Sequence, residues 1–68
     1  KEYFSVDEMV ADVGEFIFHE TNALTMQDLE ITLRMCCNAI EHESDTIMFE
    51  GLKRIVEKRV KLRMVESN

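Results

Sequence analysis

Proline is absent from this chain of 68 residues, and glycine occurs only at Gly14 and Gly51, so few residues interrupt regular backbone structure. That composition favours helices joined by short connections. No apolar run approaches the ~18 residues that a membrane-spanning helix needs, and nothing resembles a signal peptide. We therefore expect no membrane contact from this segment.

Cysteine is scarce as well. Cys36 and Cys37 are the only two, and adjacent residues suit ordinary disulfide geometry poorly. Free thiols without a cysteine framework fit a reducing, intracellular (cytoplasmic) setting. The first residue is Lys1, so we expect residues 1–68 to be a single domain taken from a longer protein. A core this small supplies only ~3–5 kcal/mol, and such domains often depend on oligomerisation.

Charge is sorted along the chain. Residues 1–50 carry twelve acidic and two basic side chains, whereas residues 51–68 carry six basic and two acidic ones. The formal charges of −10 and +4 give the net charge of −6. A basic helix on an acidic body is able to meet nucleic acid, an acidic partner, or the acidic half of a second copy.

Two helix starts follow a capping pattern. At the first, the Ser5 hydroxyl is expected to accept from the Glu8 amide, the Glu8 carboxylate to reach back to the Ser5 amide, and Phe4 to form a hydrophobic staple. Thr25 and Asp28 repeat the pattern at the second. These signatures locate two helices.

The whole pattern predicts an all-α domain of three helices. We expect them over about residues 6–20, 26–41 and 46–65, with Ser44 or Asp45 capping the third. Short connections favour helices packed on near neighbours. The residues predicted to face the core are Val6, Met9, Val10, Val13, Phe16, Ile17, Leu29, Leu33, Cys36, Cys37, Ile40, Met48, Phe49, Leu52, Ile55, Val56 and Val60.

A second apolar face is predicted on the middle helix. At about 100° per residue, Ile31 and Met35 lie almost opposite the core stripe, with Ala39 alongside. Phe18 also points away from the stripe of its own helix. Single exposed apolar residues are normal on monomers. The alternative, which we favour, is that these four residues form an interface, most simply with a second copy in a symmetric homodimer.

The basic cluster of the last helix allows several interpretations. Arg59 and Arg63 project near the centre of its apolar face, so they are either solvated or meet carboxylates of another subunit. The outer group is either a solvated face with Glu50–Arg54 and Glu57–Lys61 pairs, or a binding surface. The possible binding residues for nucleic acid or an acidic partner protein are Lys53, Arg54, Lys58, Arg59, Lys61 and Arg63. The acidic pI of about 4.7 counts against nucleic acid.

Catalytic and metal-binding patterns are not found. Cys36 and Cys37 are placed on the core side of their helix, which favours structural thiols over reactive ones. His19 and His42 lie near helix ends, where histidines are often dipole partners, and no HExxH or CxxC motif accompanies them. We expect no enzyme activity, no metal and no cofactor.

The chain resembles the small enterobacterial biofilm and acid-stress regulators of the AriR type, also called connector proteins. The resemblance covers about residues 13–60. It rests on Val13-Gly14-Glu15, Leu24-Thr25, Ile40-Glu41 and Ser44-Asp45, followed by Leu52, Ile55 and Val56 in a final amphipathic helix. It implies a small helical dimer that modulates transcription or signalling through protein contacts. Together the observations predict a non-catalytic regulatory or assembly module, with nucleic-acid binding as the alternative.

Overall fold

Residues 2–67 of the computed structural model are described, and among them the regular structure is helical, with no strand. The elements are α1 (Val6–Glu20), the 3₁₀ turn η1 (Thr21–Ala23), α2 (Met26–His42) and α3 (Ile47–Glu66). The all-α, three-helix prediction is confirmed, and the three α-helix bounds differ from the predicted ones by at most one residue.

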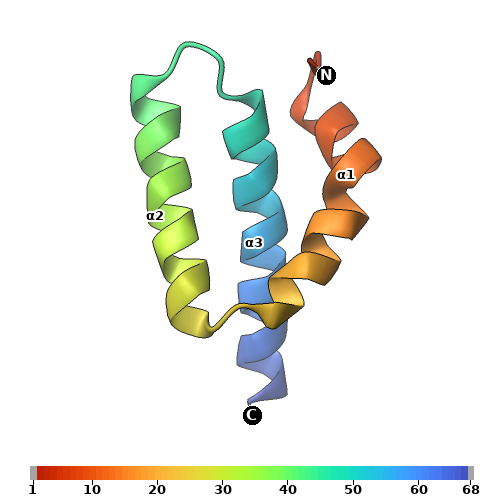
Figure 1. Ribbon diagram of the computed structural model, residues 1–68, viewed down its shortest axis with the longest axis vertical. Coiled ribbons are helices and arrows are strands. Elements are labelled where there is room, and N and C mark those ends of the chain that lie inside the picture. Colours follow the sequence, from red (N-terminus) through yellow and green to blue (C-terminus); the bar gives the residue numbers. More distant parts are fainter. Residues whose placement is uncertain (1, 68) are drawn as a thin grey trace.

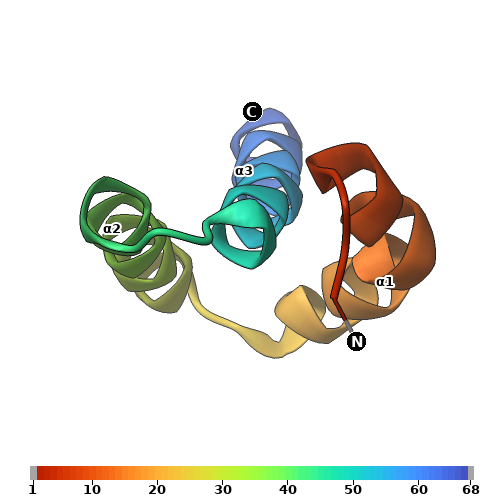
Figure 2. The same cartoon turned by 90° about the horizontal axis from the view of Figure 1, so that it is seen from above.

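Helix α3 lies between the other two (Figure 1). Seen from above, α1 and α2 flank α3 on opposite sides and stand apart from each other (Figure 2). Each therefore packs mainly on α3. The longest dimension of the molecule is 38 Å. None of the described helices combines the length and the apolar character needed to cross a bilayer.

The two capping sites form as the sequence indicated, with one difference. The Thr25 hydroxyl accepts from the Asp28 amide and the Asp28 carboxylate accepts from the Thr25 amide, each at 3.1 Å. At α1 the Ser5 hydroxyl accepts from the Glu8 amide at 3.1 Å. However, Glu8 accepts from the amide of Phe4, not of Ser5, and Phe4 is 93% exposed. The staple prediction was therefore wrong.

The third helix begins at Ile47, which is one residue later than a cap at Asp45 and two residues later than a cap at Ser44 would place it. Its N-cap residue is Thr46, whose side chain makes no capping bond to the backbone and donates to the Glu50 carboxylate at 3.1 Å. Asp45 accepts from the Ile47 amide at 3.5 Å, a long contact. A cap two residues before the helix is weaker than the Thr25 cap because its geometry is poorer.

The core is smaller than the sequence suggested. Its fully covered apolar residues are Met9, Leu29, Cys36, Ile55 and Val56. Four residues predicted to point inward are exposed instead: Phe16, Cys37, Met48 and Phe49. The reason is the arrangement of the helices. Since α1 and α2 each have α3 as their one substantial neighbour, only a narrow strip of each is covered.

Gly51 sets how closely α1 approaches α3. A Cβ atom on Gly51 would overlap the thioether sulfur of Met9, which is fully buried. Gly14 on α1 faces the same interface, where an added Cβ would lie 3.8 Å from Cδ1 of Ile55. The close approach of the two helices therefore depends on Gly51, because a larger residue there would push the axes apart, whereas 3.8 Å at Gly14 is an ordinary van der Waals contact.

Candidate interaction surface

The apolar edge of α2 is where the sequence placed it. Ile31 is 42% exposed and Met35 is 66% exposed, while Ala39 is half-buried. The capping box fixes where α2 begins, and the helical repeat decides which of its residues share a face. Leu29 and Cys36 turn toward α3 and are buried, which leaves Ile31 and Met35 on the uncovered side.

A shallow groove of about 340 Å³ runs beside this edge, between α2 and α3. Met35 and Ala39 line it from α2, and Phe49 and Leu52 line it from α3. Ala39 carries only a methyl group, so it leaves the groove open where a larger side chain would fill it. The groove joins the α2 edge to the exposed ring of Phe49, which extends the apolar surface onto a second helix.

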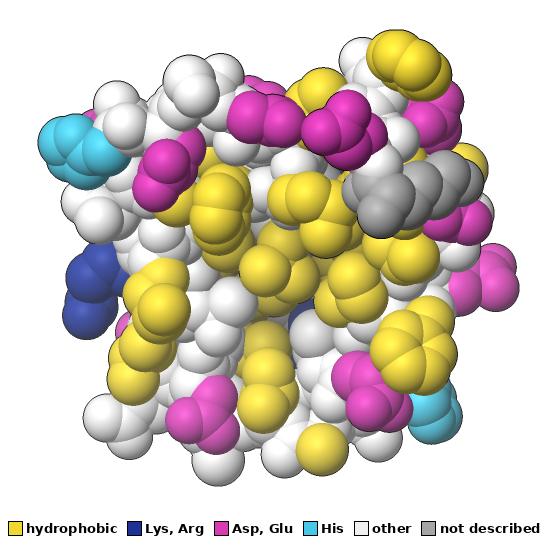
Figure 3. All heavy atoms as spheres, turned by 45° about the horizontal axis from the view of Figure 1, so that its top comes forward, with side chains coloured by type: hydrophobic (Ala, Val, Ile, Leu, Met, Phe, Trp, Pro, Cys, Tyr) yellow, Lys and Arg dark blue, Asp and Glu magenta, His cyan; other side chains and the backbone are white. Residues whose placement is uncertain are grey.

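One face of the molecule is strongly apolar. Figure 3 shows hydrophobic side chains spread across its middle, acidic side chains around its edge, and almost no lysine or arginine. Contiguous apolar area of this kind on a small protein marks an interaction site more often than a solvated surface. A surface edged with carboxylates also repels phosphate groups.

Phe18 does not join this apolar edge. It is half-buried on α1, with the guanidinium of Arg59 3.9 Å and the ammonium of Lys58 4.8 Å from the centre of its ring. Two cations close to one aromatic ring make cation–π contacts within the chain. The structure therefore groups Ile31, Met35 and Ala39 and places Phe18 elsewhere, in contact with α3.

Arg59 is the most deeply placed cation. It is only 8% exposed, donates to the Thr21 hydroxyl at 3.1 Å, and donates to the Phe18 carbonyl at 2.8 Å. Arg63 donates to the carbonyls of Thr21 and Asn22 at 3.2 and 3.0 Å. The predicted solvation is therefore wrong for Arg59, while Arg63 is half-buried, and a contact with carboxylates of another subunit stays a prediction.

The reason lies at the end of α1. The last carbonyls of a helix have no donor within the helix and carry the negative end of its dipole. A guanidinium supplies several donors and a positive charge in one planar group. Arg59 and Arg63 thus bond α3 to the end of α1 and to η1, a role that no local sequence pattern signals.

The remaining cations do not form one continuous stripe. Arg54 pairs with Asp7 of α1 at 2.7 Å, which replaces the predicted Glu50–Arg54 pair. Lys58 lies over the Phe18 ring, and Lys61 is exposed. Lys53 is half-buried, and its positive charge acts to lower the pKa of the Cys36 thiol, against the larger effect of burial, which raises it.

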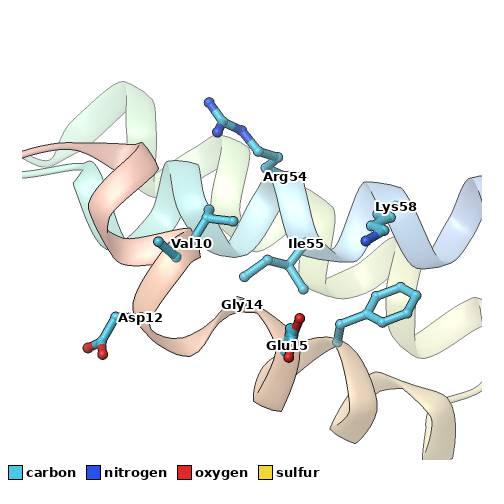
Figure 4. Close-up of a pocket in the computed structure, with 9 residues that line it drawn as sticks. Val10, Asp12, Gly14, Glu15, Arg54, Ile55 and Lys58 are labelled. Carbon is cyan, nitrogen blue, oxygen red and sulfur yellow. The ribbon is translucent and has the colours of Figure 1, made fainter.

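A second hollow, of about 420 Å³, lies between α1 and α3. Val10, Gly14 and Ile55 meet at its centre, while Asp12 and Arg54 point away from it (Figure 4). Asp12 accepts a hydrogen bond from the Tyr3 hydroxyl at 2.6 Å, which raises the pKa of that tyrosine. The hollow thus has an apolar centre, and because Asp12 is turned away from it, no pair of carboxylates converges there.

The two cysteines differ in environment. Cys36 is buried, and burial raises the pKa of its thiol above the ordinary value, with the neighbouring Cys37 adding to the effect. Cys37 is exposed, contrary to the prediction that both lie in the core. Among residues 2–67, no cluster of three or more histidine, cysteine or acidic side chains has a geometry able to hold a metal ion.

Sequence reasoning missed part of the apolar surface. Phe16 is 69% exposed, and Met48 and Phe49 are also exposed, although all three were assigned to the core. By helical periodicity, all three residues fall on the side of their helix that also carries core residues. Only the wide separation of α1 from α2 leaves them uncovered, so no signal within each helix would have identified them.

Comparisons with known proteins do not place the chain in a family. A scan against protein-family models, a search of curated proteins and a search of solved structures each found no match. The resemblance to the AriR-type regulators consequently stays a prediction.

Proposed function

We propose that this protein is a non-catalytic interaction domain that forms a homodimer through the exposed edge of α2 and acts as a regulatory or assembly module inside the cell. The observation that carries the proposal is the exposure of Ile31 and Met35 beside the groove lined by Ala39 and Phe49. Apolar area exposed to water is unfavourable. Association of two copies would remove that area from water and so stabilise the dimer.

The size of the domain supports the same conclusion. A core with five fully covered apolar residues is small for independent stability, and a second copy would bury additional apolar surface. The exposed residues also differ from isolated surface hydrophobes, since Met35 and Phe49 line one groove. A further partner protein would use the apolar surface that remains outside the dimer, such as Phe16.

Nucleic-acid binding through α3 is the alternative. Three of the six cations, Arg54, Arg59 and Arg63, already bond within the chain. Releasing them to contact phosphates would break those bonds, so the arginine contacts weigh against this alternative. The lysines that remain available are spread over different sides of α3 and offer few phosphate contacts.

Sedimentation velocity over a concentration series tests the proposal. The native chain is expected to dimerise, and Met35→Glu is expected to shift it to monomer, because the dimer would have to bury the new charge. Gln27→Glu is the matched control: it introduces the same residue at an exposed polar position of α2 and should leave the dimer intact. A native chain that remains monomeric at high micromolar concentration contradicts the proposal.

Fluorescence anisotropy with a labelled duplex and a labelled single strand at low salt tests the alternative. We expect no binding even with protein in large excess. Salt-dependent binding that Lys61→Glu weakens would favour nucleic acid over self-association.

A further inference from the structure

We infer that the α2 edges of two copies pack antiparallel, with the two-fold axis passing beside Met35. The inference rests on the homodimer proposed above and adds its register. It identifies which residue of one copy meets which residue of the other, and therefore what makes the surface specific for a second copy of this chain.

Residues equally far before and after Met35 on the edge of α2 complement one another. The spacing of three and four residues places one side chain per turn along a single face, at Asp28, Ile31, Met35, Ala39 and His42. In an antiparallel pair, each residue faces the one equally far beyond Met35 on the other copy. Met35 thus meets Met35, Ile31 meets Ala39, and Asp28 meets His42.

The apolar pairs fit by shape. Ala39 leaves the groove between α2 and α3 open, and Leu52 and Phe49 form its far wall. Ile31 of the second copy, facing Ala39, is the branched side chain that fills such a gap. Because of the symmetry the same insertion occurs twice. It would cover the exposed ring of Phe49 and pack the small residue of one copy against the large residue of the other.

The polar ends match by charge. The Thr25 hydrogen bonds lower the pKa of Asp28, so its carboxylate is ionised at neutral pH. The imidazole of His42 is exposed at the opposite end of α2, and its Nε2 atom lies 4.0 Å from the Glu41 carboxylate of the same helix, a contact long enough to leave it open to a second carboxylate. Antiparallel packing brings each carboxylate to an imidazole, whereas parallel packing would bring two Asp28 carboxylates together. Charge complementarity therefore favours the antiparallel arrangement and a second copy of this helix as the occupant.

Disulfide trapping tests the register. In a Cys36→Ala/Cys37→Ser background, Met35→Cys should form a covalent dimer on mild oxidation, and the double variant Ile31→Cys/Ala39→Cys should do so as well. Ile31→Cys alone is the control. Its two copies would lie about 12 Å apart along the helices, which exceeds the ~4.4–6.8 Å between Cα atoms that a disulfide spans.

The outcomes separate the register from the dimer itself. Cross-linking of Met35→Cys without that of Ile31→Cys supports the register. A chain that sediments as a dimer but cross-links through Ile31→Cys alone, or not through Met35→Cys, overturns the register and leaves the homodimer standing. A chain that is monomeric before oxidation overturns both.

A charge test needs no cysteine. At neutral pH, His42→Lys should tighten the dimer and His42→Glu should weaken it. The dimer contains two pairs of residue 42 with Asp28, and each pair is attractive in the first variant and repulsive in the second. The dissociation constants of the two variants should therefore differ by about tenfold. Glu30→Lys is the control, since it changes charge at an exposed position on another face of α2. Equal dissociation constants for the two His42 variants overturn the pairing with Asp28.

Discussion

The two sides of α3 hold their neighbouring helices by different means. Toward α1, α3 offers Gly51 for close packing, Arg54 for an ion pair, and Arg59 and Arg63 for carbonyl groups. Toward α2, the covered residues are apolar, and no hydrogen bond or ion pair joins α2 to α3 among residues 2–67. The interface between α1 and α3 thus depends on directional hydrogen bonds and an ion pair, whereas the interface between α2 and α3 depends on apolar packing.

This difference teaches where a binding surface can form. Hydrogen bonds to the partly buried carbonyls of Phe18 and Thr21 fix the angle of α1, because a carbonyl shielded from water costs free energy if it is left without a donor. Apolar packing is less directional, so α2 is held at its covered strip while its flanking apolar residues stay in contact with solvent. On the α1 side of α3, the arginines find their hydrogen-bond acceptors within the same chain. On the α2 side, apolar residues remain exposed, and a second molecule would add contacts there.

The largest expected effect is on the α1 side, from Gly51→Leu. The new side chain would occupy the volume of Met9, which is fully buried, and overpacking of this kind costs about 3 kcal/mol. Urea denaturation measures the loss. In Met9→Ala/Gly51→Leu, the exchanged sizes should recover part of it, so that the double variant is more stable than the sum of the single changes predicts. Additive losses would contradict the close contact.

The next effect is expected from Arg59→Met, which keeps the apolar stem and removes the guanidinium. The Phe18 carbonyl and the Thr21 hydroxyl each lose a donor, which should lower the free energy of unfolding by about 2 kcal/mol. Lys61→Met, on the exposed side of the same helix, should change it by less than about 0.5 kcal/mol. Similar losses for both variants would show that Arg59 contributes only surface charge.

A smaller effect is expected at the start of α2, and it depends on pH. The bond to the Thr25 amide, followed by that to the Thr25 hydroxyl, lowers the pKa of Asp28 below its ordinary value in the folded chain. The stabilisation is therefore present above the unfolded pKa and is lost as pH falls through the lower folded pKa. Asp28→Asn should destabilise at pH 7 and much less near pH 2 in thermal unfolding. Glu30→Gln, on the same helix, is the control, and an equal loss at both pH values would contradict the carboxylate cap.

The smallest effect on stability is expected from Cys37→Ser, because the side chain is exposed and surface substitutions usually change stability little. The useful measurement is the rate of labelling by a thiol reagent at neutral pH. The native chain should react in one fast and one slow phase, since burial raises the pKa of Cys36 and hides it. Cys37→Ser should abolish the fast phase and Cys36→Ser the slow one. Equal rates would show that α2 is turned differently on α3.

The helices could be predicted closely, while the site could be predicted only in part. Capping signals at Ser5 and Thr25 are local, so they located the starts of α1 and α2 without any tertiary knowledge. The second apolar face of α2 also followed from periodicity, and it was found at Ile31 and Met35. Phe18 was grouped with the edge of α2 because helical periodicity shows only that it points away from the core stripe of its own helix. Periodicity does not show that two cations of α3 lie against its ring.

The sequence by itself determined the number of helices, their limits and the uncovered edge of α2, because these depend on side chains within one or two turns of each other. Only the tertiary structure decided which apolar residues are covered and what the arginines bind. Arg59 reaches a hydroxyl 38 residues away and a carbonyl 41 residues away in sequence, and Phe16 is uncovered because α2 stands apart from α1. Both outcomes depend on where three helices sit in space, and no local pattern encodes that placement.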